Sequence, residues 1–524
     1  MSFVLQKSKS GSKTIEINGR LIHSLYSPEK EAFRFISQLY ANEKPNLIIL
    51  FGAGLGYIHD AIKKIYPHAR VFLIFFHSEV FHNCSHKNKI GNHSWHPEKN
   101  QDLFDSLNQV LHDYDYDRVM MIKWEPSIQA FPQLAKISAG ILHQSLSQLK
   151  GSFRTIQGFG KNWISNSFMN YVSIQKIISG QLISPEKFPV LAASGYSLKE
   201  SITFIKAYRN YIQLIALPSS LSILNEYEIT PDVIVVTDPG FYSAYHFRFH
   251  KFKNPVIAMP LSAAKGIYNL FNEFYLFHQP HFFETSLLQY FNHSFLHIPP
   301  QGTVAASALA LILAQTNTPC FVTGLDLAFM DIHGHVIPNS FYDIQLLNST
   351  RLRPLYSNLF KNAVNTSDDI LFKDQRISKS LKLYADYFNL LPTAIKKRIY
   401  ITEHEKMLKG FQIFDEKKFS MNQFSKAPVN YNKLENIPSH RLRKNQALLL
   451  LDSWLKDLDQ NSNTFHFIEE LFYFINPIEY SRFKHHQQYK EEALFENSLN
   501  LLKAECSDYL YSLKNKIKAL RVDF

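Results

Sequence analysis

Short apolar runs alternate with helical patterns between residues 185 and 345 of the chain. The runs are rich in Val and Ile and end at Pro, Gly, Asp or Ser: FPVLAAS, YIQLIALP, PDVIVVTD, NPVIAMP and PCFVTGLD. Continuous apolar runs of this kind are typical of strands that are buried on both faces. The pattern therefore predicts an α/β fold with a central, Rossmann-like, mostly parallel sheet covered by helices.

Different patterns flank this region. The stretch NLIILFGAGLGYIHDAIKKIYPHARVFLIFF near the N-terminus indicates strand, glycine turn, helix and strand. Towards the C-terminus Leu recurs at three- and four-residue spacing, as in RKNQALLLLDSWLKDLDQ, which is typical of helices. We predict three domains: an N-terminal Rossmann-like α/β domain over 1–150, a central α/β domain over 151–355 and a helical C-terminal region over 356–524.

Composition narrows the class of protein. The three cysteines, Cys84, Cys320 and Cys506, are far apart, which argues against a disulfide framework or a zinc site and favours a reducing cytoplasm. The first residues lack an apolar signal region, and no run of about 18 apolar residues predicts a spanning helix. The net charge of +11 fits either a solvated basic surface or an anionic ligand. Basic residues form no dense stripe interleaved with aromatic residues, so nucleic acid is a poor candidate partner.

The first glycine turn, Gly52-Ala53-Gly54-Leu55-Gly56, follows a strand and opens a helix. Its G-x-G-x-G spacing differs from the G-x-G-x-x-G dinucleotide pattern, and His77 stands about where an acidic ribose ligand is expected. We therefore predict a structural turn in a degenerate Rossmann-like domain. The histidine-rich stretch that follows, which includes His82, His86, His93 and His96, has irregular spacing and predicts a solvated loop rather than a metal site.

A second turn, in PVLAASGYSLKE, carries more chemistry. Gly195 allows close approach of the backbone to a ligand, and Ser197-x-x-Glu200 predicts a capping box at the start of a helix. The free N–H groups and positive dipole of a helix N-terminus favour a phosphate. The alternative is a tight strand–helix connection that binds nothing.

Polar residues also follow two other predicted strands and precede one predicted helix. Asp238 ends one strand, and Gly302 and Thr303 precede a helix of small residues that Thr303 is expected to cap. Gly324 and Asp326 end another strand, and His333 and His335 follow in a polar loop. Each has a purely structural alternative. Because ligands of open α/β sheets bind at the carboxyl ends of strands, an Asp and a His there could act as general acid and base.

In order and spacing, five segments resemble the motility associated factor (Maf) glycosyltransferases, the flagellin-modifying enzymes of the domain-of-unknown-function 115 group. These segments are FRTIQGFGKNWISNSFMN, AASGYSLKESI, ITPDVIVVTDPG, QGTVAASALALI and VTGLDLAF, and the resemblance is best over residues 150–345. The same elements look distantly like sialyltransferases. The resemblance implies a cytoplasmic, catalytic central domain that moves a nonulosonic acid, pseudaminic or legionaminic, from its CMP-activated form to Ser or Thr of flagellin.

Site residues are carried over by position. The resemblance implies that Gly195, Ser197, Asp238, Gly302, Thr303 and Gly324 bind the donor, and that Asp326, His335 and, as second choice, His333 are catalytic. CMP is a good leaving group, so the enzyme has to hold its phosphate, stabilise an oxocarbenium-like centre and take a proton from the acceptor hydroxyl, and we expect no metal and no cofactor beyond the CMP-sugar. Where the family has Gly and Pro, this chain has Ala193 and Tyr196. The bulky Tyr196 is expected to narrow the pocket or to stack on a base.

Two other readings stay open from the sequence. A second branch of the same group resembles pterin diphosphokinases, which transfer pyrophosphate from ATP and need magnesium and several carboxylates. The second alternative is a protein without catalytic activity that binds flagellin through its helical C-terminal region. Binding of CMP, or of ATP with magnesium, distinguishes the three.

Overall fold

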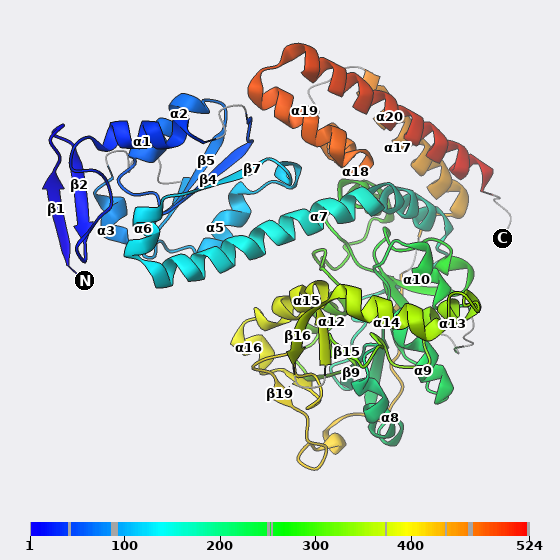
Figure 1. The fold of residues 1–524 in the computed structure, drawn as a ribbon. Coiled ribbons are helices and arrows are strands. Elements are labelled where there is room, and N and C mark those ends of the chain that lie inside the picture. The colour runs from blue at the N-terminus through cyan, green and yellow to red at the C-terminus, as the bar shows by residue number, and fades with distance from the viewer. Residues whose placement is uncertain are drawn as a thin grey trace. The chain divides into compact units, whose positions relative to one another are not determined.

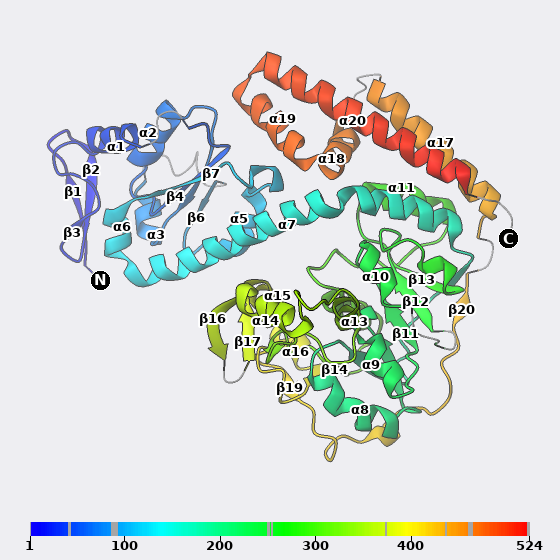
Figure 2. The same cartoon turned by 45° about the vertical axis from the view of Figure 1, so that its right-hand side comes forward.

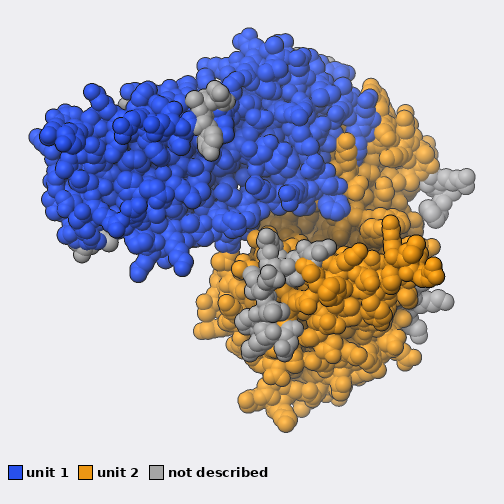
Figure 3. Space-filling view, in the orientation of Figure 1, with its two compact units in different colours: residues 1–160, 457–509 blue, residues 161–456, 510–524 orange. Residues whose placement is uncertain are grey.

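A computed structural model describes residues 2–39, 43–84, 93–248, 252, 255–372, 375–434, 437–459 and 465–520. The chain divides into two compact units (Figure 3), residues 1–160 with 457–509 and residues 161–456 with 510–524. The three domain ranges drawn from the sequence stay a prediction. The compact units group the chain differently, because the first unit combines N-terminal and C-terminal segments. Position 86 of the histidine-rich stretch lies outside the described residues.

Unit 1 is built on a four-stranded parallel sheet in the order β6-β5-β4-β7. The strands are β4 (Leu47–Phe51), β5 (Arg70–Ile74), β6 (Ser94–Trp95) and β7 (Val119–Lys123), and helix α2 (Tyr57–Ile65) connects β4 to β5. An antiparallel sheet of β1 (Phe3–Lys7), β2 (Lys13–Ile17) and β3 (Arg20–Leu21) precedes them. The remaining helices of this part are α1 (Pro28–Ser37), α3 (Ser78–His82), α5 (Leu103–Val110) and α6 (Glu125–Ala130).

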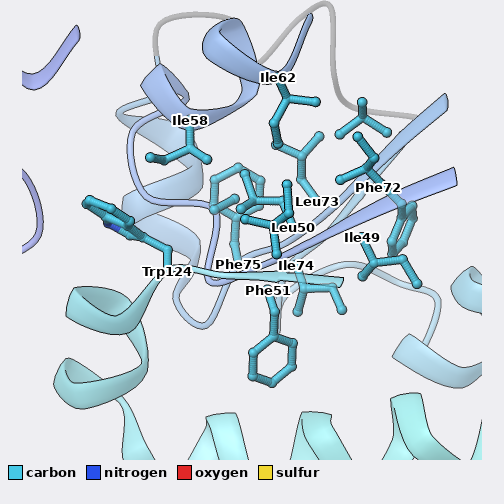
Figure 4. Close-up of a cluster of buried hydrophobic side chains, with 14 of the residues drawn as sticks. Ile49, Leu50, Phe51, Ile58, Ile62, Phe72, Leu73, Ile74, Phe75 and Trp124 are labelled. Atoms are coloured by element: carbon cyan, nitrogen blue, oxygen red, sulfur yellow. The ribbon is translucent and has the colours of Figure 1, made fainter. Parts of the chain in front are cut away.

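The core of unit 1 follows directly from its apolar strands. Every residue of β4 is buried, and Figure 4 shows Leu50 beside Leu73 of β5 on the side of α2, whereas Phe51 points to the opposite face of the sheet. Helix α19 (Pro477–Tyr489) belongs to the same unit because its polar side chains bind the start of β4. His485 Nδ1 lies 2.7 Å from Asn46 Oδ1, and Gln488 donates to the carbonyl of Asn46 at 2.8 Å. The other late helices are α17 (His440–Asp459), α18 (Phe465–Ile475) and α20 (Glu492–Ala519).

Unit 2 contains a ten-stranded sheet in the order β19-β18-β14-β9-β10-β11-β12-β13-β8-β20. All neighbours pair in parallel except β20 with β8. The five apolar runs of the sequence form β9 (Phe188–Ala192), β10 (Ile212–Ala216), β11 (Val233–Val235), β12 (Val256–Met259) and β14 (Cys320–Thr323). The others are β8 (Lys176–Ser179), β13 (Glu273–Leu276), β18 (Ile399–Ile401), β19 (Gln412–Ile413) and β20 (Asn432–Lys433). The predicted α/β class with a mostly parallel central sheet is confirmed.

The order of strands reverses beside β9. From β9 the chain proceeds through β10 to β13 on one side, and β14 then returns to pair with the other side of β9. Connections from β9 and β14 therefore leave in opposite directions and open a crevice at their carboxyl ends, which is where ligands bind in open α/β sheets. Unit 2 thus has its natural binding position at the β9–β14 edge.

Helices cover both faces of this sheet (Figures 1 and 2). Helix α12 (Val304–Gln315) packs on β9 and β11, and its run of small residues, Ala305, Ala306, Ser307 and Ala308, is buried. The other helices of the sheet are α8 (Ser197–Ala207), α9 (Leu221–Glu226), α10 (Phe241–Tyr245), α11 (Phe282–Leu288) and α16 (Thr393–Lys396).

A small antiparallel sheet, in the order β15-β17-β16, follows β14. Its strands are β15 (Phe329–Met330), β16 (Ser367–Phe372) and β17 (Gln375–Ser378), and its helices are α13 (Ser340–Leu347), α14 (Leu355–Thr366) and α15 (Lys379–Asn389).

Helix α7 (Pro132–Ser173) contributes its last turns to unit 2. There Asn170 donates to the carbonyls of Leu261 and Ala263 at 2.8 Å, which holds the loop after β12 at the carboxyl edge of the large sheet.

Candidate active site

The turn after β9 is held against the end of β14 by backbone hydrogen bonds. The N–H of Ala193 donates to the carbonyl of Thr323 at 2.8 Å, and that of Gly195 donates to the carbonyl of Gly324 at 2.6 Å. A Cβ at Gly195 would overlap the carboxylate of Asp326 and the carbonyl of Gly324. Glycine is therefore required at this position because the Asp326 side chain lies against it.

Helix α8 begins at Ser197, as predicted, but the predicted capping box does not form. The N-cap is Tyr196, without a side-chain cap hydrogen bond. The two side chains of the motif are engaged elsewhere: the hydroxyl of Ser197 faces buried carboxyls, and Glu200 Oε2 lies 2.9 Å from His404 Nε2. Tertiary partners have replaced the local reciprocal bonds.

Asp326 and Glu405 approach each other through Ser197. The Ser197 hydroxyl lies 3.1 Å from Asp326 Oδ2 and 3.2 Å from Glu405 Oε1, and its oxygen accepts the N–H of Gly324 at 2.8 Å. Asp326 Oδ2 also accepts the N–H of Ser197 at 3.1 Å. All three side chains are buried. The ends of β9, β14 and β18 are therefore tied together by one hydroxyl and two carboxyls.

Burial changes the acidity of both carboxyls. Removal from water raises the pKa of Asp326, against the lowering effect of its hydrogen bonds from Ser197. Burial and then the charge of Asp326 also raise the pKa of Glu405, against the lowering effect of its hydrogen bonds from the backbone N–H groups of Leu325 and Thr402. Because two like charges this close penalise each other, the carboxyls titrate as a pair.

His335 stands beside this pair on a second chain of hydrogen bonds. Its Nδ1 lies 2.8 Å from the Ser194 hydroxyl, to which Ser219 donates at 2.9 Å. The ring stacks on Phe341, with centroids 5.7 Å apart. Protein atoms around the ring lower the pKa of His335, although the residue as a whole stays exposed. The imidazole is therefore neutral at pH 7 and able to accept a proton.

A cavity of about 190 Å³ opens in front of these groups. Of the predicted catalytic residues, Asp326, His333 and His335 all line it. Two of its lining side chains, Asp326 and Gln375, each carry a buried oxygen, Oδ1 and Oε1, with no hydrogen-bond partner among the described residues. Its other lining residues are Tyr196, Lys199, Ala328, Met330, Asp331, Gly334, Val336 and Ile337. The cavity thus has a mostly apolar lining with polar groups at Asp326, His333 and His335, which suits a ligand with both apolar and polar parts.

None of the six predicted donor-binding residues is among the residues that line this cavity. The hydroxyl of Ser197 and the backbones of Gly195 and Gly324 are engaged in the bonds that join β9 to β14. Their roles toward a donor stay predictions.

Three further candidates lie at other points of the same sheet. Asp238 follows β11, is exposed, and accepts the N–H of Gly240 at 2.6 Å, which closes a turn. Thr303 caps α12, as predicted, by accepting the N–H of Ala306 at 3.1 Å, and Gly302 precedes it at the surface. None of the three lines the cavity described above.

Sequence reasoning missed Glu405, Ser194 and Ser219. Glu405 follows β18, whose three residues, Ile399 to Ile401, lie in a segment assigned to the helical region. The apolar run is followed by Thr402 and, three residues later, by Glu405, the same spacing as Thr323 and Asp326 after β14, and this signal could have found Glu405.

The first glycine turn, in unit 1, is occupied by the protein itself. The N–H of Leu55 donates to His23 Nε2 at 3.0 Å, and a Cβ at Gly54 would overlap the same imidazole. His23 is buried and stacks on Trp124 with centroids 5.4 Å apart. A side chain fills the position that a phosphate takes in dinucleotide-binding turns, so the predicted structural role of this turn fits the geometry.

Comparisons with known proteins agree with this architecture. Residues 161–331 match the family described as 6-hydroxymethylpterin diphosphokinase MptE-like. The Maf glycosyltransferase of Magnetospirillum magneticum AMB-1 superposes with a TM-score of 0.62 over 99% of this chain and 92% of that chain, at 10% sequence identity. This protein has the Maf fold.

The resemblance to the Maf group that the motifs indicated is thereby confirmed, and at this low identity the likeness is one of fold. A protein of Treponema pallidum (strain Nichols), named only as uncharacterized, is 25% identical over 360 residues, 66% of this chain and 74% of its own length. Within the described part of the chain, no helix combines the length and apolar character needed to cross a bilayer.

Proposed function

We propose that unit 2 of this Maf-fold protein is a cytoplasmic glycosyltransferase that moves a nonulosonic sugar, pseudaminic or legionaminic acid, from its CMP-activated form to a Ser or Thr hydroxyl of flagellin. One observation carries the proposal. His335, kept neutral by its surroundings and held by Ser194, lines a cavity at the point where the strand order reverses. The fold of the Maf glycosyltransferase supports the reaction class.

His335 takes the role of general base. The tautomer that donates Nδ1–H to the Ser194 hydroxyl leaves the Nε2 lone pair to accept the proton of the acceptor hydroxyl. The acceptor oxygen forms a bond to the anomeric carbon while the bond from that carbon to the CMP phosphate oxygen breaks, and CMP departs with the electron pair. A neutral, oriented imidazole in this role contributes about 10²- to 10⁴-fold in rate.

Two other side chains that line the cavity, Lys199 and Tyr196, are complementary to the phosphate and the base of the CMP donor. Lys199 lines the cavity, and no other lysine or arginine is among the described residues that do so. Its ammonium group supplies positive charge for a phosphate. Tyr196, which is exposed, offers a ring face on which a cytosine can stack. This explains why a bulky residue is tolerated at the turn.

Pyrophosphate transfer from ATP is the second candidate, and the name of the matching family favours it. That reaction requires magnesium held on the phosphates by carboxylates. The cavity offers Asp326 and Asp331, of which Asp326 directs one oxygen at Ser197. Among the described residues, the three-ligand group with suitable spacing is His485, His486 and Glu491 in unit 1, so the cavity carboxylates lack that arrangement.

Calorimetry with CMP, and separately with ATP plus magnesium, distinguishes the candidates. Micromolar binding of CMP supports glycosyl transfer, and binding of ATP and magnesium alone would replace it with the diphosphokinase. Binding of neither, with flagellin present, would leave a flagellin-binding protein without chemistry.

The role of His335 is tested by transfer from a CMP-nonulosonate to flagellin, followed by mass spectrometry. We expect His335→Ala to lower the transfer rate about 10²-fold or more. His293→Ala, an exposed histidine of the same unit outside the cavity, is the matched control and should transfer normally. Equal rates in both variants would refute the assignment of the base.

A further inference from the structure

The carboxyl group of Asp326 has one oxygen that nothing in the fold explains. Oδ2 accepts from both the N–H and the hydroxyl of Ser197, whereas Oδ1 is buried and has no partner among the described residues. Asp326 is only 4% exposed and lines the cavity. An ionised carboxylate oxygen in that position would lack both water and a donor, which is costly.

Two other buried carboxyls of unit 2 show the usual solution. Glu405 Oε1 accepts the N–H of Leu325 at 3.0 Å, and Oε2 accepts that of Thr402 at 2.6 Å. Glu284, also fully buried, accepts the N–H groups of Ser262 and Gln279 at 2.7 and 3.0 Å. Donors on both oxygens favour the ionised form of a carboxyl. Unlike Glu405 and Glu284, Asp326 accepts hydrogen bonds on only one of its two carboxyl oxygens, Oδ2.

The shared hydroxyl then forces a choice between Asp326 and Glu405. Ser197 has one hydroxyl hydrogen, so it can donate to Asp326 Oδ2 or to Glu405 Oε1 but not fully to both. Two buried carboxylates at this separation repel each other, and such pairs retain one proton. The lone pairs of Glu405 face backbone donors, which leaves Asp326 Oδ1 as the free position for that proton.

We propose that Asp326 and Glu405 hold a single proton at neutral pH, that it resides on the buried Asp326 Oδ1 beside the cavity, and that binding of the donor substrate brings this oxygen into contact with an anionic group, to which it donates a hydrogen bond. Glu405 is a positioning residue, because its negative charge keeps Asp326 neutral. The anionic group is the phosphate of the nucleotide, and this part rests on the proposed function. The assignment of the proton to Asp326 Oδ1 does not rest on the proposed function.

The arrangement removes an electrostatic conflict from the site. A carboxylate on the wall of a cavity that binds a phosphate would repel it, whereas a carboxylic acid donates to it. Other ionisable groups act on the same space and their effect must be separated by variants. They are Lys199 and Glu200 on α8, Asp331, His333 and His335 after β14, and His404 and Glu405 after β18.

Infrared spectroscopy locates the proton without any ligand. The spectrum of Asp326→Asn is subtracted from that of the wild type at pH 7, in protein made by cell-free synthesis with ¹³C-carboxyl aspartate or with ¹³C-carboxyl glutamate. We expect a protonated-carboxyl C=O band in the difference that shifts with labelled aspartate only. A band that shifts with labelled glutamate, or the absence of such a band, would overturn the proposal.

Calorimetric titration with CMP from pH 7 to pH 9 tests the role of the proton. CMP is already fully ionised there, since the second pKa of a phosphate monoester is about 6. Wild-type affinity should fall about tenfold as the pair loses its proton. Asp326→Asn, whose amide can place N–H groups where Oδ1 lies, should show a flat profile. The matched control Asp331→Asn, an exposed carboxylate of the same cavity, should keep the wild-type slope.

The outcomes separate the two proposals. A wild-type slope in Asp326→Asn would refute the donor role of Asp326. Failure of the wild type to bind CMP at any pH would remove the nucleotide from the proposed function, while the infrared result would still decide where the proton resides. Glu405→Gln is the weaker probe, because one of the backbone N–H groups at Leu325 and Thr402 would then meet an amide N–H.

Discussion

The two strand–glycine–helix turns of this protein look alike in sequence and differ in what fills them. In unit 1, the imidazole of His23 accepts the N–H of Leu55 and occupies the space that Gly54 leaves. In unit 2, the space beside Gly195 holds the carboxyl of Asp326, which belongs to the wall of an open cavity. At both turns the glycine is needed because a side chain lies against it. The identity and surroundings of that side chain then decide whether the turn belongs to a ligand-binding site.

The electrostatics of the two turns are opposite as well. His23 is buried, so its pKa is lowered and the ring is neutral at pH 7. The group beside the second turn is a carboxyl pair whose pKa values are raised. Both turns place a buried side chain against the backbone or a neighbouring hydroxyl, yet of these two side chains only Asp326, at the second turn, lines a cavity.

The largest expected effect comes from filling the second turn. Gly195→Ala places a Cβ on the Asp326 carboxylate and the Gly324 carbonyl, so we expect a loss of about 3 kcal/mol or more in the stability of unit 2. Gly302→Ala is the matched control, because nothing lies within 4 Å of its Cβ, and should change stability by less than about 0.5 kcal/mol. Denaturant unfolding with hydrogen exchange of unit 2 peptides measures both. Similar stabilities would contradict the close approach.

Emptying the first turn should destabilise unit 1 by about 2 kcal/mol. His23→Ala leaves the buried N–H of Leu55 without an acceptor and removes a ring that packs on Trp124. The exposed His143→Ala, on α7 in the same unit, serves as control and should be nearly neutral. Hydrogen exchange of peptides from β4 and α2 reports the difference, and unchanged exchange would show that His23 is not needed to close the turn.

A pH dependence of unit 1 follows from the same histidine. Its folded pKa is lowered, so the unfolded chain binds a proton first as pH falls below about 6.5, and stability decreases from there down to the folded pKa. Burial lowers the pKa of His96, His112 and His485 in the same unit, and these add in the same direction. We expect His23→Gln to show a shallower loss of stability between pH 6.5 and 5 in thermal unfolding. A slope equal to that of the wild type would assign the effect to the other three.

The smallest expected effect concerns Tyr196, the residue in the second turn that departs from the family pattern. If its ring stacks on cytosine, Tyr196→Ala should weaken CMP binding about tenfold, and Tyr196→Phe should change it little, because stacking needs only the ring. Calorimetry of the two variants tests this. Tighter binding by Tyr196→Ala would instead show that the ring narrows the cavity.

Much of the fold could be predicted from the sequence because buried parallel strands need continuous apolar runs. Five such runs became β9 to β12 and β14, and the helix starts at Ser197 and Val304 were correctly placed. Strands β8, β13, β18, β19 and β20 of the same sheet were missed, since their two to four residues form no continuous apolar run long enough to stand out from loop or helix. The capping box at Ser197 and Glu200 failed because local bonds lost to tertiary partners.

The candidate site divides in the same way. The sequence by itself determined that Asp326, His333 and His335 follow a strand end, and this was enough to place all three on one cavity. Only the tertiary structure decided that Glu405, 79 residues beyond Asp326, shares its hydroxyl partner, and that His23 closes the other turn. The physical reason is that strand and helix signals are local and repeat along the chain. The contact of two carboxyls with one hydroxyl, or of a histidine with a glycine turn, instead depends on which distant segments the folded chain brings together.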